Sequence, residues 1–116
     1  MRKIESQMID AINGNRNWSS GNTSVTFDPE TGASKVFLHG NFIATVTEDT
    51  LELFDGGWQS KTTKSRLNAL CYAFCYEGES VFQQDWKWYV RRWVGHLGQQ
   101  GCYKTEEFQN GYMFAG

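Results

Sequence analysis

The fold is decided by a nine-residue stretch that reads Val36-Phe37-Leu38-His39-Gly40-Asn41-Phe42-Ile43-Ala44. Apolar side chains lie on both sides of a polar centre, and Phe42 and Ala44 alternate with Ile43 in the period of two that is typical of β-strands. Gly and Asn tolerate the positive φ angles that a two-residue hairpin turn requires. The stretch therefore predicts two antiparallel strands joined by a tight turn at His39-Gly40-Asn41.

Short strands continue on both sides of this hairpin. Alternating side chains predict them over residues 23–27, 35–38, 42–47 and 51–54, with Gly-, Pro- or acid-rich turns between them. Strands this short, joined this tightly, are typical of an antiparallel meander. One face of such a sheet needs a cover, because an isolated sheet leaves half of its apolar side chains in water.

Two helices are predicted to supply that cover. Apolar side chains recur at helical spacing over residues 2–13 and again over residues 63–76. Thr62 or Thr63 is a natural N-cap for the second helix. We therefore expect an α+β fold in a single domain over residues 1–116, with an antiparallel meander sheet of four to six strands and two helices packed on one face.

The last third of the sequence is compatible with two structures. In residues 84–97, Trp86, Trp88 and Val90 alternate as they would in a strand, but apolar side chains also recur there at helical spacing, ending with Leu97. The wealth of aromatic and β-branched residues favours the strand.

Composition excludes several classes of protein. The chain has 116 residues and a net charge of -2, which excludes both a strongly basic DNA coat and a heavily acidic mimic of DNA. No apolar run approaches the roughly 20 residues that a membrane-spanning helix needs, and the N-terminus has no apolar signal region. The three cysteines, Cys71, Cys75 and Cys102, are an odd number, which is typical of reduced thiols. We expect a cytoplasmic protein without membrane contact.

The small net charge hides an uneven distribution along the chain. Residues 28–55 contain six acids and one base, whereas residues 61–92 contain six bases and three acids. This pattern predicts an acidic sheet in one half of the protein and a basic, aromatic surface in the other half.

Residue types that carry catalysis are not found in a recognisable arrangement. His39 lies in the predicted hairpin turn and His96 in a glycine-flanked loop, and neither belongs to a nucleophile or metal motif. Asp49, Glu52 and Asp55 are acids of the kind that turns and strand edges carry for solubility. We therefore expect no enzyme activity and no cofactor, and an enzyme built on paired carboxylates is the less favoured interpretation.

Cysteines at helical spacing raise the question of a zinc site. Cys71 and Cys75 lie one helical turn apart, and with Cys102 and His96 they have the ligand types that bind zinc. Structural zinc sites usually show tighter paired spacings, and two cysteines on the apolar stripe of a helix more often pack in a core. We therefore predict no metal site.

Two segments are candidates for binding. The first, Thr62-Thr63-Lys64-Ser65-Arg66, opens the second helix, where free N–H groups together with Lys64 and Arg66 would suit a phosphate. An ordinary capped helix with its charges in water explains the same pattern. This simpler interpretation is favoured, since every helix needs a cap.

The second candidate segment, Trp86-Lys87-Trp88-Tyr89-Val90-Arg91-Arg92-Trp93, interleaves rings with bases. Such a surface can stack the bases of a single-stranded nucleic acid, and it can equally be the hot spot of a protein interface. Simple alternation would instead place Trp86, Trp88 and Val90 in the core. Three tryptophans in eight residues are more than a small core easily absorbs. The contact candidates are therefore Trp88, Arg91, Arg92 and Trp93, followed by Lys64 and Arg66.

Several motifs together resemble a family of small proteins from tailed bacteriophages. They are the LHGN-x-IA hairpin at residues 38–44, the Asp-Gly-Gly-Trp sequence at 55–58 and the Thr-Thr-Lys-Ser-Arg-Leu-Asn-Ala-Leu helix at 62–70. The resemblance covers about residues 2–90 and weakens beyond Trp93. It implies an origin, namely a phage protein that acts in the cytoplasm of a bacterial host.

Small phage proteins of this kind often disable a host enzyme or a defence system. The resemblance therefore implies a binding protein that inhibits or modulates a bacterial host protein by protein–protein contact, for example as an anti-CRISPR or anti-restriction protein. The residues themselves leave open an alternative, a nucleic-acid-binding accessory protein that uses the basic aromatic surface. A homodimer is compatible with both functions, since self-association can cover surplus aromatic surface.

Overall fold

The computed structural model describes residues 1–95 and 102–115 of the chain. Its helices are α1 (Lys3–Asn13) and α2 (Lys61–Phe74). Its strands are β1 (Trp18–Ser20), β2 (Thr23–Asp28), β3 (Ala33–Leu38), β4 (Asn41–Val46), β5 (Thr50–Leu53), β6 (Ser80–Gln84), β7 (Lys87–Trp93), β8 (Tyr103–Glu107) and β9 (Tyr112–Ala115). Within these ranges, neither helix has the length and apolar character needed to cross a membrane.

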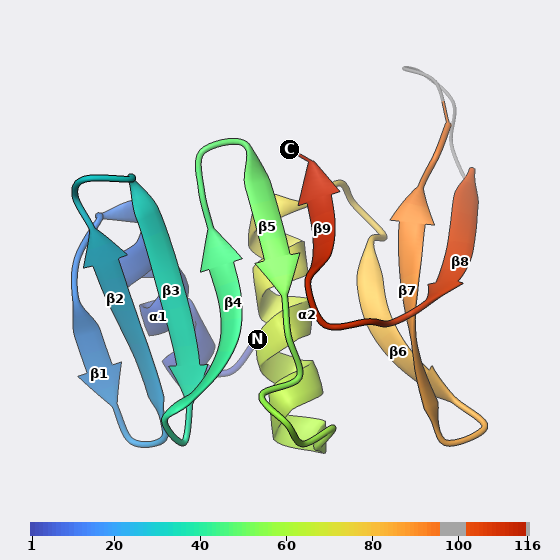
Figure 1. Ribbon diagram of the computed structural model, residues 1–116, viewed down its shortest axis with the longest axis horizontal. Coiled ribbons are helices and arrows are strands. Elements are labelled where there is room, and N and C mark those ends of the chain that lie inside the picture. Colours follow the sequence, from blue (N-terminus) through green and yellow to red (C-terminus); the bar gives the residue numbers. More distant parts are fainter. Residues whose placement is uncertain (96–101, 116) are drawn as a thin grey trace.

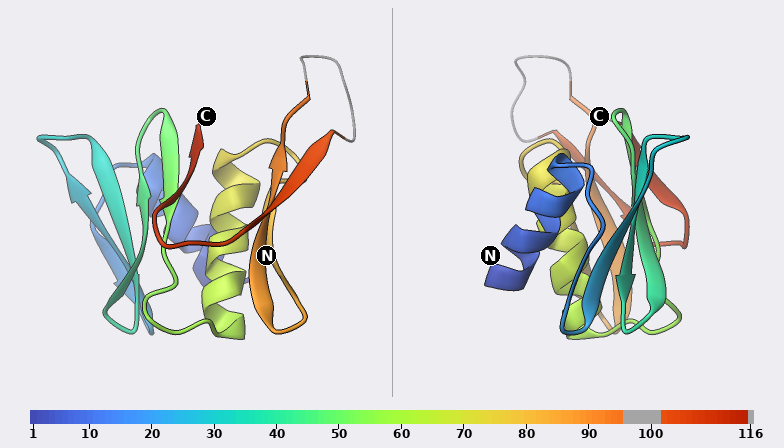
Figure 2. Two further views of the ribbon diagram at one scale, coloured as in Figure 1. Left: turned by 45° about the vertical axis from the view of Figure 1, so that its right-hand side comes forward. Right: turned by 90° about the vertical axis from the view of Figure 1, so that its left-hand side faces the viewer.

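Two antiparallel sheets lie next to each other in the fold (Figure 1). The larger sheet has the strand order β1-β2-β3-β4-β5-β9, and the smaller sheet has the order β6-β7-β8. Both helices lie on the same side of the larger sheet (Figure 2). The predicted α+β class, the meander and the two helices on one face are confirmed, and the separate smaller sheet is a feature that the sequence did not predict.

The core lies between the larger sheet and the helices. Met8 of α1, Leu67 and Leu70 of α2, and Ile43 and Leu53 of the strands are all fully buried there. Burying a side chain of this size contributes roughly 1.5–3 kcal/mol to stability. The same apolar cluster continues into the smaller sheet, so the two sheets share one core.

The β3–β4 hairpin has the tight turn that its sequence predicts, with one correction. The positive φ angles belong to His39 (52°) and Gly40 (78°), whereas Asn41 already pairs with Leu38 as the first residue of β4. The register shifts within this hairpin and leaves Ile43 without a partner of its own. Such a bulge turns two successive side chains toward the same side, which is why Ile43 and its neighbour are both buried.

Most of the ambiguous segment over residues 84–97 that the structure describes is strand β7 (Lys87–Trp93). β7 pairs with β6 on one side and β8 on the other, so the strand interpretation is confirmed. The alternation begins only at Lys87, because Asp85 and Trp86 form the turn between β6 and β7. Leu97, which the helical interpretation used, lies outside the described residues.

Helix α2 begins earlier than predicted. Its N-cap is Ser60, whose Oγ accepts the backbone N–H of Thr63 at 3.1 Å. Thr62 and Thr63 therefore lie in the first turn and are not the cap. The helix stops at Cys75, where the backbone becomes extended with φ -111° and ψ 176°.

A side chain joins α2 to the smaller sheet in place of a neighbouring strand. The Asn68 amide donates through Nδ2 to the carbonyl oxygen of Val81 at 2.8 Å, and its Oδ1 accepts the N–H of the same residue at 2.7 Å. This amide satisfies the backbone groups that β6 would otherwise leave unpaired near the core. The position of the smaller sheet relative to the helix is therefore fixed by hydrogen bonds as well as by packing.

Candidate interaction surface

The two faces of the smaller sheet differ in character. On one face, Trp88 and Val90 are buried, and the Trp88 ring packs edge-on against Phe108 with 5.6 Å between ring centroids. Strand alternation turns Tyr89 and Arg91 to the opposite face, where Tyr89 is half-buried and Arg91 is exposed. The second face is therefore the side of the sheet that a partner can reach.

Five rings and one guanidinium form three contacting pairs on this second face, which together we call the aromatic strip. Its members are Tyr76, Phe82, Tyr89, Arg91, Trp93 and Tyr103. The ring centroids are 4.9 Å apart for Tyr76–Trp93 and 5.8 Å apart for Phe82–Tyr89. The Arg91 guanidinium lies 4.0 Å from the centroid of the Tyr103 ring, which is a cation–π contact. These contacts hold the side chains in place before any partner arrives.

A buried carboxylate supports one end of the strip. Glu79 accepts the backbone N–H of Tyr76 at 2.9 Å and the backbone N–H of Trp93 at 3.0 Å, so it joins the segment after α2 to β7. The Tyr103 hydroxyl donates to the carbonyl oxygen of Glu77 at 2.7 Å. A side chain at Gly78, which has φ 89°, would collide with that hydroxyl, so this close approach requires glycine.

The folded chain does not have the basic half that the charge pattern predicts. Arg66 is withdrawn from the surface by an ion pair with Glu5 at 2.9 Å. β8 comes from beyond the basic segment and brings Glu106 and Glu107 next to β7. Strand alternation places two bases, Lys87 and Arg91, and the acid Glu107 on the face of the aromatic strip, with Asp85 at the hairpin tip. Arg92, Lys104 and Glu106 lie on the opposite face. The aromatic surface is therefore close to neutral.

The contact candidates chosen from the sequence are not all brought together. Arg91 and Trp93 belong to the aromatic strip. Trp88 and Arg92 point to the other face, where Trp88 is buried and Arg92 lies 5.8 Å from the centroid of the Tyr112 ring. Lys64 is half-buried on α2, and Arg66 is buried. Trp88 and Arg66 are thus corrected to core residues.

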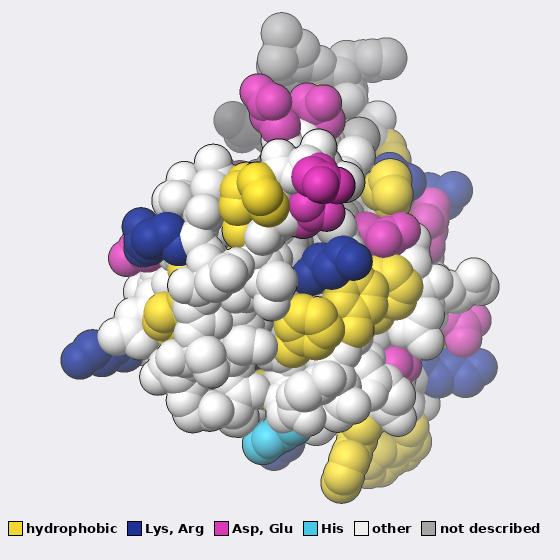
Figure 3. Space-filling view, turned by 60° about the vertical axis from the view of Figure 1, so that its left-hand side comes forward, with side chains coloured by type: hydrophobic (Ala, Val, Ile, Leu, Met, Phe, Trp, Pro, Cys, Tyr) yellow, Lys and Arg dark blue, Asp and Glu magenta, His cyan; other side chains and the backbone are white. Residues whose placement is uncertain are grey.

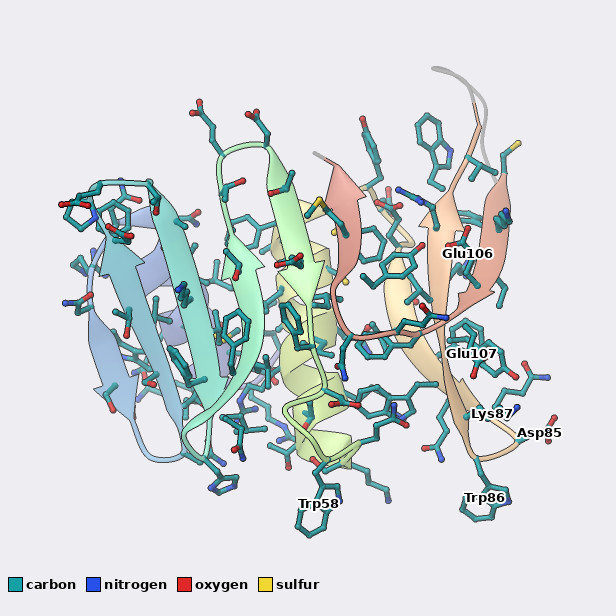
Figure 4. The ribbon with its side chains drawn as sticks, viewed as in Figure 1. Trp58, Asp85, Trp86, Lys87, Glu106 and Glu107 are labelled. Carbon is teal, nitrogen blue, oxygen red and sulfur yellow. The ribbon has the colours of Figure 1, made fainter. Side chains whose placement is uncertain are left out.

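Among the residues that the structure describes, the aromatic ring with the largest exposed fraction lies at the tip of the β6–β7 hairpin. Trp86 is 91% exposed, between the exposed side chains of Asp85 and Lys87 (Figure 4). Asp85 and Trp86 have φ angles of 51° and 68°, in the left-handed region. For a residue other than glycine this conformation costs roughly 1–2 kcal/mol. The chain thus places a large apolar ring where both backbone and water disfavour it, and such strain often marks a functional position.

A hollow of about 380 Å³ lies between the β3–β4 turn, the segment that follows β5 and the first turn of α2. Leu38, Ile43 and Trp58 contribute apolar walls, and Asp55 and Thr62 contribute polar ones. We call it the Trp58 hollow, because the Trp58 ring is 77% exposed beside it. A volume near 380 Å³ is at the small end of the roughly 300–1,000 Å³ that ligand pockets span.

Comparison with known proteins identifies the family of the chain. A family model of the Kyanoviridae Gp96 protein matches residues 1–115. The chain belongs to this family of tailed-phage proteins. The match extends through the C-terminal third, where the resemblance read from the motifs had weakened. Neither a curated protein nor a solved structure matches the chain.

A further apolar patch of the phage protein lies on the face of the larger sheet that the helices do not cover. The Phe42 ring contacts Phe37 at 5.8 Å and Phe54 at 4.6 Å between ring centroids. Figure 3 shows apolar side chains gathered together, with charged side chains around them. Lys35 is an exposed base on the neighbouring part of β3.

A hydrogen-bonded carboxylate and phenol lie on the buried-Trp88 side of the smaller sheet. The Tyr112 hydroxyl donates to Glu106 Oε2 at 2.9 Å. Burial first, and then this hydrogen bond, raise the pKa of Tyr112 to about 12. The same bond, aided by Lys104 and Arg92, holds the pKa of Glu106 below its ordinary value. The phage protein therefore keeps this pair as a phenol and a carboxylate at neutral pH.

Two of the three cysteines considered for zinc, Cys71 and Cys75, lie beside each other. Cys71 is buried, and its hydrogen bond with Cys75, together with burial, raises the pKa of its thiol well above the ordinary value. A raised pKa keeps the thiol protonated, whereas zinc binds the thiolate. No group of three or more His, Cys, Asp or Glu side chains in residues 1–95 and 102–115 has the geometry to hold a metal ion. His96 lies outside these ranges.

The sequence interpretation did not include Trp86 among the contact candidates, and it used Trp58 only as part of the Asp-Gly-Gly-Trp motif. One signal was present for Trp86: the Gln84-Asp85-Trp86-Lys87 segment has an acid at the first turn position, as in Asp-Gly turns. A tryptophan in place of the expected glycine broke the pattern and hid the hairpin. Trp58 follows two glycines and precedes a helix, which is a typical place for a loop.

Proposed function

We propose that this phage protein binds a protein of its bacterial host in the host cytoplasm and inhibits or modulates it, without catalysing a reaction. The proposed target is a defence effector of the host, such as a nuclease or a CRISPR complex. The observation that carries the proposal is the aromatic strip, in which rings and Arg91 are held in fixed contact on an accessible sheet face.

The composition of the strip favours a protein partner. Trp, Tyr and Arg are the residue types that dominate the hot spots of protein interfaces, and the cores of such interfaces are depleted in charge. The strip has this composition, with one guanidinium among five rings. Fixed side chains also lose little conformational freedom on binding, which reduces the entropic cost of association.

The charge balance argues against a nucleic acid. Affinity for nucleic acids comes mainly from bases that neutralise phosphates and release counterions. On the face of the strip, Glu107 of β8 lies opposite Tyr89, and Asp85 is two positions from Lys87 in sequence. A polyphosphate strand on this face would therefore meet two bases, Lys87 and Arg91, with two acids, Asp85 and Glu107, close to them.

Affinity capture with two matched charge reversals tests the proposal. Arg91→Glu changes an exposed strand residue within the strip, and Lys35→Glu changes an exposed strand residue on the other sheet. Tagged wild-type protein and both variants, each checked by circular dichroism, are incubated with host lysate with and without nuclease. We expect wild type and Lys35→Glu to retain one dominant host protein after nuclease treatment, and Arg91→Glu to lose it by roughly tenfold or more, as for a hot-spot residue.

Once the host protein has been purified, the proposed inhibition can be tested directly. Its activity should fall on addition of wild-type protein and of Lys35→Glu, but not of Arg91→Glu. Recovery of nucleic acid alone, or of proteins that all disappear with nuclease and with added salt, would shift the function to nucleic-acid binding. Equal capture by wild type and Arg91→Glu would remove the aromatic strip as the contact surface.

A further inference from the structure

Trp86 has the properties of a side chain that inserts into a hollow. Its ring is 91% exposed at the end of a hairpin whose strands pair over five residues each. Both turn residues have left-handed backbone angles, which Gly adopts readily and Trp does not. A ring placed there against both backbone preference and hydration is best explained by a contact that covers it.

The Trp58 hollow is already formed and has firm walls. The Asp55 carboxylate accepts the N–H of Gly57 at 2.8 Å, which fixes the turn after β5. The carbonyl oxygen of Trp58 accepts the N–H of Ser60 at 3.1 Å and the hydroxyl of Thr63 at 3.3 Å. Its volume of about 380 Å³ leaves room for an indole, which is smaller than the drug-sized ligands that such pockets enclose.

The hairpin tip and the hollow are complementary in chemistry. An indole has one N–H to donate and no acceptor, and the Asp55 carboxylate at the hollow is an acceptor for it. Lys87 beside the ring carries the charge opposite to that of Asp55. Asp85 on the other side of the ring is matched by Lys61 and the positive N-terminal end of α2, next to the hollow-lining Thr62.

Both features lie at the same end of the molecule. Figure 4 shows Trp58 and Trp86 projecting from its lower end, one before α2 and one between β6 and β7. When a protruding ring and a matching hollow share one end, a two-fold axis brings the ring of each copy to the hollow of the other, and the assembly closes as a dimer. An unrelated partner would need to bring its own hollow for Trp86 and its own ring for the Trp58 hollow.

We propose that two copies of the chain form a two-fold symmetric dimer in which Trp86 of each copy enters the Trp58 hollow of the other. This contact is separate from the aromatic strip and does not depend on the proposed function. Each buried tryptophan removes about 150–250 Å² from water. With an equal area of hollow wall, the dimer covers about 600–1,000 Å² in total, which is typical of weak, reversible association. The dimer should therefore form only at micromolar or higher concentration.

Sedimentation velocity over a concentration series tests the dimer, with three variants. Trp86→Gly removes the ring and suits the left-handed backbone, and Asn41→Trp fills the hollow from an exposed residue in its lining. Tyr72→Ala is the control, because Tyr72 is 82% exposed on α2 and belongs to neither feature. We expect a monomer–dimer equilibrium for wild type and Tyr72→Ala, and at least a tenfold weaker one for Trp86→Gly and Asn41→Trp. Thermal unfolding of each variant confirms that it is folded.

Hydrogen exchange keeps the proposal testable if Asn41→Trp does not fold. At high wild-type concentration, amides near Trp86 and amides in residues 55–63 should both become protected, and both effects should vanish in Trp86→Gly. Protection at the tip alone would overturn the insertion into the hollow. A wild type that stays monomeric, a dimer that persists in Trp86→Gly, or open-ended oligomers would each overturn the two-fold arrangement. A monomeric Trp86→Gly that still captures the host protein would separate this contact from the proposed function.

Discussion

Arg66 on α2 and Glu5 on α1 form an ion pair at 2.9 Å, and each side chain is only 3% exposed. The guanidinium also donates through Nε to the Thr23 hydroxyl at 3.0 Å and through a terminal nitrogen to Asn22 Oδ1 at 3.2 Å. Glu5 accepts a further hydrogen bond from the Ser65 hydroxyl at 2.6 Å. One buried network therefore joins both helices to the start of β2.

Removing one partner of this pair should destabilise the protein more than removing both. Arg66→Met leaves the Glu5 carboxylate buried without its counter-charge, and we expect a loss of about 3–5 kcal/mol in the free energy of unfolding. The double variant with Glu5→Met replaces two charges by apolar groups and should recover much of that loss. Urea denaturation of the single and double variants measures both quantities. A double variant less stable than Arg66→Met would contradict the argument.

The Glu5 network also predicts how stability depends on acid. Burial alone would raise the pKa of Glu5, but hydrogen bonds from Ser65, the N–H of Arg2 and Arg66 outweigh it and lower the pKa. A lowered pKa means that the contribution of Glu5 is complete above its unfolded pKa and is lost as the pH falls through the lower, folded pKa. Glu5→Gln should therefore flatten the loss of stability below about pH 4 that wild type shows. Urea midpoints at several acidic pH values, with Glu30→Gln as an exposed control, provide the measurement.

Local patterns in the sequence were sufficient to predict most helices and strands, but they did not predict the burial of Arg66. The meander was predictable because each strand is bounded by its own turn, and each helix carries its own apolar stripe. Arg66 was interpreted as a surface cation because its neighbours in sequence are polar. Its burial depends on Glu5, which lies 61 positions earlier and reaches it only when α1 and α2 pack together. No local pattern contains that information.

The same limit explains the interaction surface. Alternation correctly separated Trp88 and Val90 from Tyr89 and Arg91, but it could not show which face a partner would reach. The charge of that surface was misjudged because β8, with Glu107 on the face of the strip, is brought to β7 from beyond the segment that was counted. The sequence left open which tryptophan is exposed, because the turn at Trp86 uses a residue that turn statistics disfavour.

Tyr112 should ionise only at strongly alkaline pH. Its pKa of about 12 places its ionisation well above the ordinary value near 10. In a spectrophotometric titration, the difference between wild type and Tyr112→Phe should therefore appear only at the alkaline end. Because the folded pKa is raised, the contribution of Tyr112 to stability is complete below its unfolded pKa and is lost as the pH rises toward the folded value. Loss of an ordinary tyrosine step in Tyr112→Phe would contradict this assignment.

Replacing Asn68 should loosen the smaller sheet from α2. Asn68→Ala leaves the N–H and carbonyl of Val81 without partners beside the core, and each unpaired buried group costs about 1–3 kcal/mol. We expect a loss of about 2–4 kcal/mol and faster hydrogen exchange at the Val81 amide. Asn68→Asp keeps the acceptor for that N–H but loses the donor, so its amide should remain better protected than in Asn68→Ala. Equal exchange in the two variants would show that the side chain does not hold this edge.

Trp86→Gly and Gly40→Ala should change stability in opposite directions. The first places glycine at a position with a left-handed backbone, and the second removes glycine from such a position. Removing the left-handed strain at Trp86 should stabilise the folded protein by roughly 1–2 kcal/mol. Glycine also has more conformational freedom in the unfolded chain, which lowers stability by about 0.5–1 kcal/mol. The net effect of Trp86→Gly should be a gain of up to about 1.5 kcal/mol, measured by urea denaturation at a concentration where the protein is monomeric. Gly40 has φ 78° and open space around it, so alanine there introduces the strain without a clash and should lower stability. A less stable Trp86→Gly would show that the ring stabilises its own chain, whereas a more stable one that fails to associate would show that the ring is present for contact.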